Sequence, residues 1–199
     1  THLLKFFDHV HWQLDFVWSD RWKDVEGWLE SIYKPGLKEL MNLWIEEMSK
    51  GNVLGIAPFQ GILKRMKEGG PAPPCGAAVD SFAVSTDGRV LTCPIAVQEK
   101  WACLGEVKDL KLRKLGKSMI GEPCTSCEYY KVCGGRCLYT YKERFWGEKG
   151  FMLTCEASKY IIDLVKSQIE KIEDLVKEEK VDWGSLLYPP FNNTVEIMP

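Results

Sequence analysis

Apolar and polar residues alternate over residues 10–17, and this period of two, together with the aromatic content, predicts a β-strand. The polar residues of one face are His11, Gln13 and Asp15. Those of the opposite face are Trp12, Leu14 and Phe16. The polar face would either contact a cofactor or substrate, or consist of ordinary polar residues of a strand.

A helical period follows this strand. Ser19 or Asp20 can cap a helix that runs to about Tyr33. Pro35 suits the first turn of a second helix, and Gly51 can end it. The pattern therefore predicts two helices in succession.

Residues 53–57 are predicted to form a short buried strand, and residues 59–67 a short helix. The resulting order of strand, helix, strand and helix predicts parallel β/α units. Two such strands cannot make a domain alone, so these units need a larger sheet to cover them.

A run of glycine and proline at residues 69–74 is the best candidate for a domain boundary. Beyond it, two apolar runs flank residues 85–88, where the Asp-Gly pair at 87 and 88 predicts a β-hairpin. Residues 94–155 are predicted to be loop-rich. A long amphipathic helix is expected from Glu156 to about Lys180, followed by an irregular tail.

Composition narrows the class of protein. The chain has 199 residues, with 26 Lys and Arg against 28 Asp and Glu, and 45% of its residues are hydrophobic. This balance is typical of a soluble globular protein, and a net charge of -2 leaves no basic excess for nucleic acid. No apolar run approaches the roughly 18 residues needed to cross a bilayer, so no membrane partner is expected. We expect the protein to be cytoplasmic. The sequence begins with Thr1 and not with an initiator methionine, and no signal peptide pattern follows. We therefore interpret the chain as part of a longer protein.

The number and clustering of the cysteines are unusual for a generic enzyme. All eight cysteines lie between Cys75 and Cys155. The densest group is Cys124-x2-Cys127-x5-Cys133-x3-Cys137, in which Gly134 and Gly135 allow a sharp turn. Cys75 and Cys93 bracket the predicted hairpin and are therefore expected to lie near each other. Cys155 is expected at the start of the long helix, where a helix N-terminus would stabilise its thiolate.

Three kinds of chemistry compete for these thiols. Disulfides suit small secreted domains, and nothing in the sequence indicates secretion. Structural zinc sites often use Cys-x2-Cys pairs, of which only one is present here. Iron–sulfur clusters use soft sulfur ligands without histidine. Spacing alone leaves zinc and iron–sulfur equally open.

The whole pattern, Cys75-x12-Gly88-x4-Cys93, then the four-cysteine group, then Cys155, resembles the seven-cysteine SPASM signature. This domain extends many radical S-adenosylmethionine enzymes that modify peptides. The resemblance implies an α+β fold: the last β/α units of a partial (β/α)6 barrel in residues 1–72, a SPASM domain in 73–156, and an amphipathic helix and tail in 157–199. The full enzyme would act on a peptide or protein substrate by hydrogen abstraction.

The resemblance also implies two auxiliary [4Fe-4S] clusters, which would transfer electrons or anchor the substrate. The ligands of auxiliary cluster II would be Cys124, Cys127, Cys133 and Cys155. Those of auxiliary cluster I would be Cys75, Cys93 and Cys137. Its fourth ligand is open: either Cys103 folds back to it, or one iron is free to take a substrate group. If Cys103 is not a ligand, it is expected to be a buried free thiol.

Two departures from the family pattern matter. The Cys-x3-Cys-x2-Cys motif that binds S-adenosylmethionine and the catalytic [4Fe-4S] cluster is missing, so the chain alone is expected to be inactive. Sulfatase-maturating members place an Asp base next to the hairpin cysteine, but here Pro94 follows Cys93, so that chemistry is not expected. An external electron donor is a further expected partner. Arg136 would either stabilise cluster charge or be exposed to solvent. The alternative from another class is a zinc-stabilised module that binds a protein without catalysis.

Overall fold

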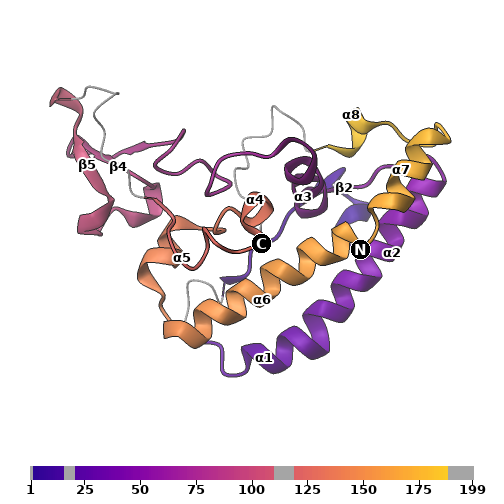
Figure 1. Cartoon of the computed structure of the whole chain (residues 1–199), viewed down its shortest axis with the longest axis horizontal. Coiled ribbons are helices and arrows are strands. Elements are labelled where there is room, and N and C mark those ends of the chain that lie inside the picture. Colours follow the sequence, from indigo (N-terminus) through magenta and orange to yellow (C-terminus); the bar gives the residue numbers. More distant parts are fainter. Residues whose placement is uncertain (1, 16–20, 110–118, 188–199) are drawn as a thin grey trace.

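The computed structural model describes residues 2–15, 21–109 and 119–187. Two rows of helices run side by side along the long axis of the molecule, and a small sheet lies at one end (Figure 1). The helices are α1 (Val25–Trp28), a π-helical segment (Leu29–Tyr33), α2 (Lys34–Ser49), α3 (Ala57–Glu68), α4 (Tyr130–Cys133), α5 (Leu138–Glu143), α6 (Gly147–Lys166), α7 (Ile169–Lys177) and α8 (Trp183–Leu186). The strands are β1 (His9–Val10), β2 (Gly55–Ile56), β3 (Ala83–Val84), β4 (Arg89–Leu91) and β5 (Cys103–Glu106). Short 3-10 turns occupy Leu3–Lys5, Pro94–Ala96, Lys100–Ala102 and Val107–Asp109.

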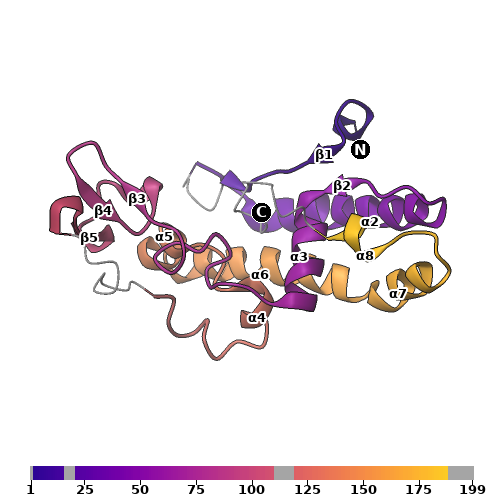
Figure 2. The ribbon, with the colours of Figure 1, turned by 90° about the horizontal axis from the view of Figure 1, so that it is seen from above.

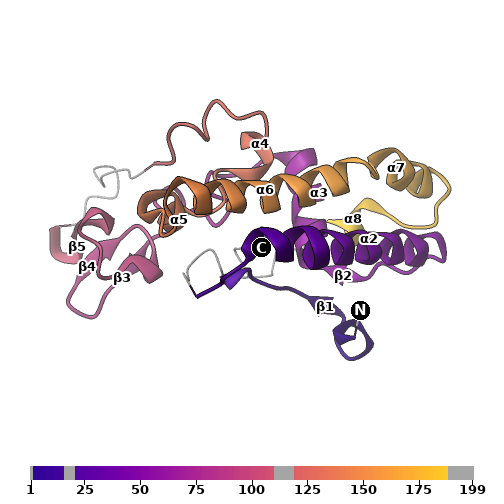
Figure 3. The same cartoon turned by 90° about the horizontal axis from the view of Figure 1, so that it is seen from below.

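One hydrophobic core joins the N-terminal and C-terminal helices. Helices α1, α2 and α3 pack against α6 and α7, and the views from above and below keep α7 and the β3–β5 sheet at opposite ends (Figures 2 and 3). Trp44 and Phe59 are fully buried at its centre, with ring centroids 5.4 Å apart. Trp44 Nε1 donates a hydrogen bond of 2.9 Å to the Leu54 carbonyl. Residues 1–72 and 157–199, predicted as separate units, thus contribute to the same core. Among the described residues, no helix combines the length and apolar character that crossing a bilayer requires.

The two helices predicted before residue 51 are one continuous helix. Helix α1 runs through the π-helical segment into α2, and the predicted break at Pro35 is wrong. The Lys34 amide donates to the carbonyl of Leu29, five residues back, and this wider turn lets the backbone continue past a proline. The predicted caps Ser19 and Asp20 lie outside the described residues. Asp24 is the N-cap, and its Oδ1 accepts a 2.8 Å hydrogen bond from the Gly27 amide.

Parallel pairing of the first two strands is confirmed. His9 pairs with Gly55, and Val10 with Ile56. The first strand is much shorter than predicted, because residues 11–15 leave the ladder and residues 16 and 17 lie outside the described part. The side chains of His11 and Gln13 instead contact each other, with 2.9 Å between nitrogens.

The predicted hairpin is also confirmed. Strands β3 and β4 pair antiparallel, and Gly88 has a φ of 86°, as the turn requires. The third strand, β5, was not predicted, and it pairs with β4 across a register irregularity between Val90 and Leu91. With these two small sheets beside a helical body, the α+β class is confirmed.

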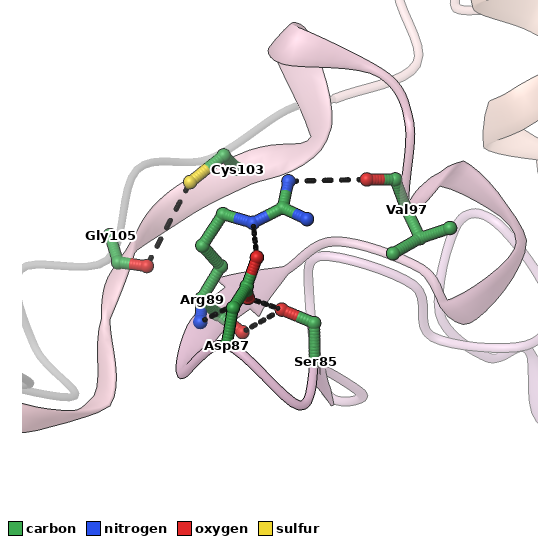
Figure 4. A network of polar contacts seen from close by, with 6 residues as sticks. All are labelled: Ser85, Asp87, Arg89, Val97, Cys103 and Gly105. Atoms are coloured by element: carbon green, nitrogen blue, oxygen red, sulfur yellow. Dashed lines mark hydrogen bonds and ion pairs between the residues drawn. The ribbon is translucent and has the colours of Figure 1, made fainter.

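A polar network fixes the hairpin turn (Figure 4). Asp87 accepts hydrogen bonds from the Ser85 hydroxyl and from the Arg89 side chain and amide. Arg89 Nη1 also donates to the Val97 carbonyl at 3.1 Å. The bonds from Ser85 and Arg89 lower the pKa of Asp87 to about 2.

Asp87→Asn is therefore expected to destabilise the protein near neutral pH and to matter less in acid. The folded pKa lies below the ordinary value of about 4, so the stabilisation by this carboxylate is present above pH 4 and is lost as the pH falls toward 2. Denaturant midpoints of both proteins, measured between pH 7 and pH 3, should converge as the pH falls. A constant gap would contradict a contribution from the charge.

The predicted helix 156–180 begins earlier and is broken. Helix α6 starts at Gly147, and α7 resumes at Ile169 after a break at Ser167 and Gln168. The first turns of α6 contain two glycines, which disfavour a helix, but burial of Phe151 and Leu153 in the fold stabilises the helical conformation there. The start predicted at residue 156 is therefore wrong by nine residues.

Candidate metal centre

Four thiols line one cavity of 220 Å³ whose wall includes residues of α4 and α6: those of Cys124, Cys127, Cys133 and Cys155. Its other walls are mostly apolar or aromatic, and Phe151, Tyr129 and Tyr130 are among them. All eight cysteines are free of disulfides, so the disulfide interpretation is wrong for this structure.

Local structure presents these thiols from two directions. Cys124 and Cys127 lie in consecutive turns, since the Cys127 amide donates to the Cys124 carbonyl at 3.0 Å, and Cys133 is the last residue of α4. Cys155 lies inside α6, eight residues after its start. The predicted position of Cys155 at a helix N-terminus is therefore wrong, because the helix begins before it.

Burial governs the ionisation of these thiols. It raises the pKa of Cys124 to about 11, with smaller contributions from Cys155, Cys133 and Cys127. Burial likewise raises the pKa of Cys133 and of Cys155. These mutual electrostatic effects connect all four thiols. Thiolates in this place need a cationic centre to stabilise them.

The loop between Cys133 and Cys137 has a left-handed backbone at three successive residues. The φ angles are 62° at Gly134, 74° at Gly135 and 56° at Arg136. The Arg136 amide donates a 2.9 Å hydrogen bond to the Cys133 carbonyl, and the backbone amides of Gly135 and Arg136 lower the pKa of the Cys133 thiol, which partly offsets the effect of burial. Successive amides turned in this way form an anion-binding concavity.

Two arginines lie beside the same cysteine. Arg136 is buried, with 7% of its surface exposed, so the solvent-exposed alternative is wrong. Arg65 of α3 is also buried, and it donates to the carbonyls of Val132 at 2.5 Å and Lys131 at 3.4 Å. Nothing in the sequence distinguishes Arg65 from the other basic residues of its helix, so sequence reasoning missed it.

A second group of cysteines lies toward the small sheet. Cys75 and Cys93 both pack against the same small apolar cluster. Cys137 is buried and precedes α5, and Cys93 and Cys137 both act electrostatically on Tyr139. Cys103 is exposed on β5, with its Sγ 3.8 Å from the Gly105 carbonyl oxygen (Figure 4). The alternative that Cys103 is a buried free thiol is therefore wrong.

The donor set fits a large, soft centre better than a single ion. No three His, Cys, Asp or Glu side chains of the described residues meet closely enough to hold one metal ion. Four thiols nevertheless line one cavity, and neither histidine nor carboxylate lines it. Four sulfur donors around an apolar cavity suit an iron–sulfur cluster.

Comparison with known proteins identifies the class to which the relatives of this chain belong: radical S-adenosylmethionine enzymes that modify peptides and carry a SPASM-type domain. The resemblance seen in the cysteine pattern is thereby confirmed. No family model matches the chain.

The relatives are cysteine-type anaerobic sulfatase-maturating enzymes of Clostridium perfringens. The protein of strain 13 / Type A is 30% identical over 138 residues, which cover 62% of this chain and 37% of the relative. That of strain ATCC 13124 is 29% identical over the same shares. The chain thus spans little more than a third of the length of the curated relatives that it matches.

Solved structures of anSMEcpe are similar to part of the chain. The polyhistidine-tagged protein with bound AdoMet has 22% sequence identity and a TM-score of 0.40, covering 74% of this chain and 44% of that one. The native protein with AdoMet and the Kp18Cys peptide has 24% identity and a TM-score of 0.40, covering 68% and 43%.

Proposed function

We propose that the chain is the auxiliary-cluster portion of a radical S-adenosylmethionine enzyme that modifies a peptide or protein. The observation that carries this proposal is the convergence of four thiols on one cavity without histidine or carboxylate. Cys124, Cys127, Cys133 and Cys155 would hold one [4Fe-4S] cluster. Cys75, Cys93 and Cys137 would hold three irons of a second. In this proposal residues 1–72 are the end of the partial barrel, and residues 73–156 the SPASM domain.

When bound, the clusters would transfer electrons or anchor the substrate. The chain itself positions the sulfur ligands. The Arg136 amide bonds to the Cys133 carbonyl and holds the backbone of this ligand, and helix α6 fixes Cys155. Phe151 and Tyr130 form part of the cavity wall and reduce access of water to the thiols.

The activity of the whole enzyme is proposed from the relatives. Their names describe maturation of a sulfatase, which is a modification of a protein. These 199 residues contain no Cys-x3-Cys-x2-Cys, so the proposal assigns S-adenosylmethionine and the catalytic cluster to a region outside them. Pro94 after Cys93 remains a reason to expect a modification other than that of sulfatase maturation.

Metal analysis of anaerobically purified protein tests the proposal. We expect about eight iron and eight sulfide per chain, and a brown chromophore that dithionite bleaches. Two zinc ions without a visible absorption band would overturn the proposal and favour a zinc-stabilised binding module.

Paired cysteine variants test the ligand set. Cys155→Ala should lose about half of the iron, since it removes a thiol from the four-thiol cavity. Cys103→Ala is expected to leave the iron content unchanged, because Cys103 is exposed on an edge strand. If Cys103→Ala instead lost iron as Cys155→Ala does, Cys103 would be the fourth ligand of auxiliary cluster I.

A further inference from the structure

We infer that the buried guanidinium groups of Arg65 and Arg136 act together to set the reduction potential of the cluster that Cys133 holds. The inference rests on the proposed function, because it requires a cluster in the four-thiol cavity. Both residues would place a positive charge near the cluster, and neither would contact the substrate.

Geometry places the two cations around a single sulfur ligand. Arg136 follows Cys133 by three residues and lines a small cavity together with the thiols of Cys124, Cys133, Cys137 and Cys155. Arg65 approaches from α3, far away in the sequence. A Cβ added to Gly134, the residue after Cys133, would lie only 3.1 Å from Arg65 Nη2. Both arginines also act electrostatically on Cys133.

Arg65 keeps its positive charge in these surroundings. A guanidinium keeps its proton at all ordinary pH values, even when burial lowers its pKa as it does for Arg65. No carboxylate lines the cavity that Arg136 shares with the thiols, nor the larger four-thiol cavity. The two hydrogen bonds from Arg65 to backbone carbonyls of residues 131 and 132 hold its head group without neutralising its charge.

Burial makes these charges stronger than those at the mouth of the cavity. Arg144 and Lys159 also interact with the thiols, but both are partly exposed, so water and salt screen them. Arg65 and Arg136 expose only 5% and 7% of their surfaces. Reduction adds one negative charge to a cluster, and a nearby unscreened cation stabilises the reduced form more than the oxidised form.

The test compares charge-removing with charge-keeping variants. Arg136→Gln and Arg65→Gln should each shift the midpoint potential of one cluster to a more negative value, measured by redox titration followed by electron paramagnetic resonance. Arg136→Lys and Arg65→Lys keep the charge and should restore most of the shift. Lys171→Gln removes an exposed charge of α7 and should leave the potential unchanged.

Iron content separates the possible outcomes. A wild-type chain that binds no iron would overturn the proposed function itself. Clusters retained at unchanged potential in both glutamine variants would overturn this inference alone. Loss of iron in the glutamine variants with retention in the lysine variants would support it, because the charge would then be needed to hold the cluster. Loss of iron in all four variants would overturn it in favour of a purely structural function.

Discussion

Gly135→Ala is expected to abolish iron binding at the proposed site of Cys124, Cys127, Cys133 and Cys155. A Cβ at residue 135 would lie 2.5 Å from Cγ2 of Ile120, which is itself buried. The φ of 74° is also unfavourable for alanine. Either the backbone rotates or Ile120 moves, and a rotation turns the Gly135 amide away from the Cys133 sulfur. Iron and sulfide content should fall by about half, as expected for the loss of one of two clusters.

Gly36→Ala is the matched control for this variant. Gly36 lies within α2, and a Cβ there would meet no atom within 4 Å. The same chemical change should stabilise the helix by about 0.5–1 kcal/mol and leave the iron content unchanged. Equal iron in both variants would contradict the requirement for a left-handed glycine at residue 135.

Trp44→Ala is expected to be the most destabilising single change in the core. The side chain is fully buried, contacts Phe59 and donates to the Leu54 carbonyl. Truncation removes apolar contacts, opens a cavity and leaves a carbonyl without its donor, so the free energy of unfolding should fall by about 3–5 kcal/mol. Chemical denaturation of the anaerobic protein, followed by circular dichroism, measures this loss.

Ile32→Ala provides the comparison for Trp44→Ala. Ile32 lies on the same continuous helix, but 60% of its surface is exposed. Its replacement should change the free energy of unfolding by at most about 0.5 kcal/mol. A comparable loss in both variants would show that the α2–α3 contact is not the centre of the core.

Elements defined by local chemistry could be predicted from the sequence. The turn at Asp87 and Gly88 was one, because a hairpin turn depends on backbone conformation and short-range hydrogen bonds. Strand β5 was not, since Cys103–Glu106 contains a glycine and shows no alternation, and it is ordered by pairing with β4. The start of α6 was missed for a related reason, because burial of Phe151 overrides the helix propensity of two nearby glycines.

The candidate site divides in the same way. Spacing brought Cys124, Cys127 and Cys133 together, since all three lie within ten residues of one another. Only the family resemblance added Cys155, whose place in the cavity depends on how α6 packs. The place of Arg65 near the site could not be predicted, because it depends on a contact between α3 and α4 that no local sequence pattern indicates.

The placement of Cys155 in the middle of α6 has a consequence for the order of assembly. Three of the four thiols can gather in a short segment before the chain has folded, but the fourth reaches them only when Ile161, Ile162 and Val165 of the same helix have entered the core. If these thiols hold iron as proposed, complete coordination and docking of the helix are linked events, and each stabilises the other. In the proposed site, iron bound by all four thiols would hold α6 in its docked position, and removal of the iron should loosen α6 as well as the loop that carries the other three thiols.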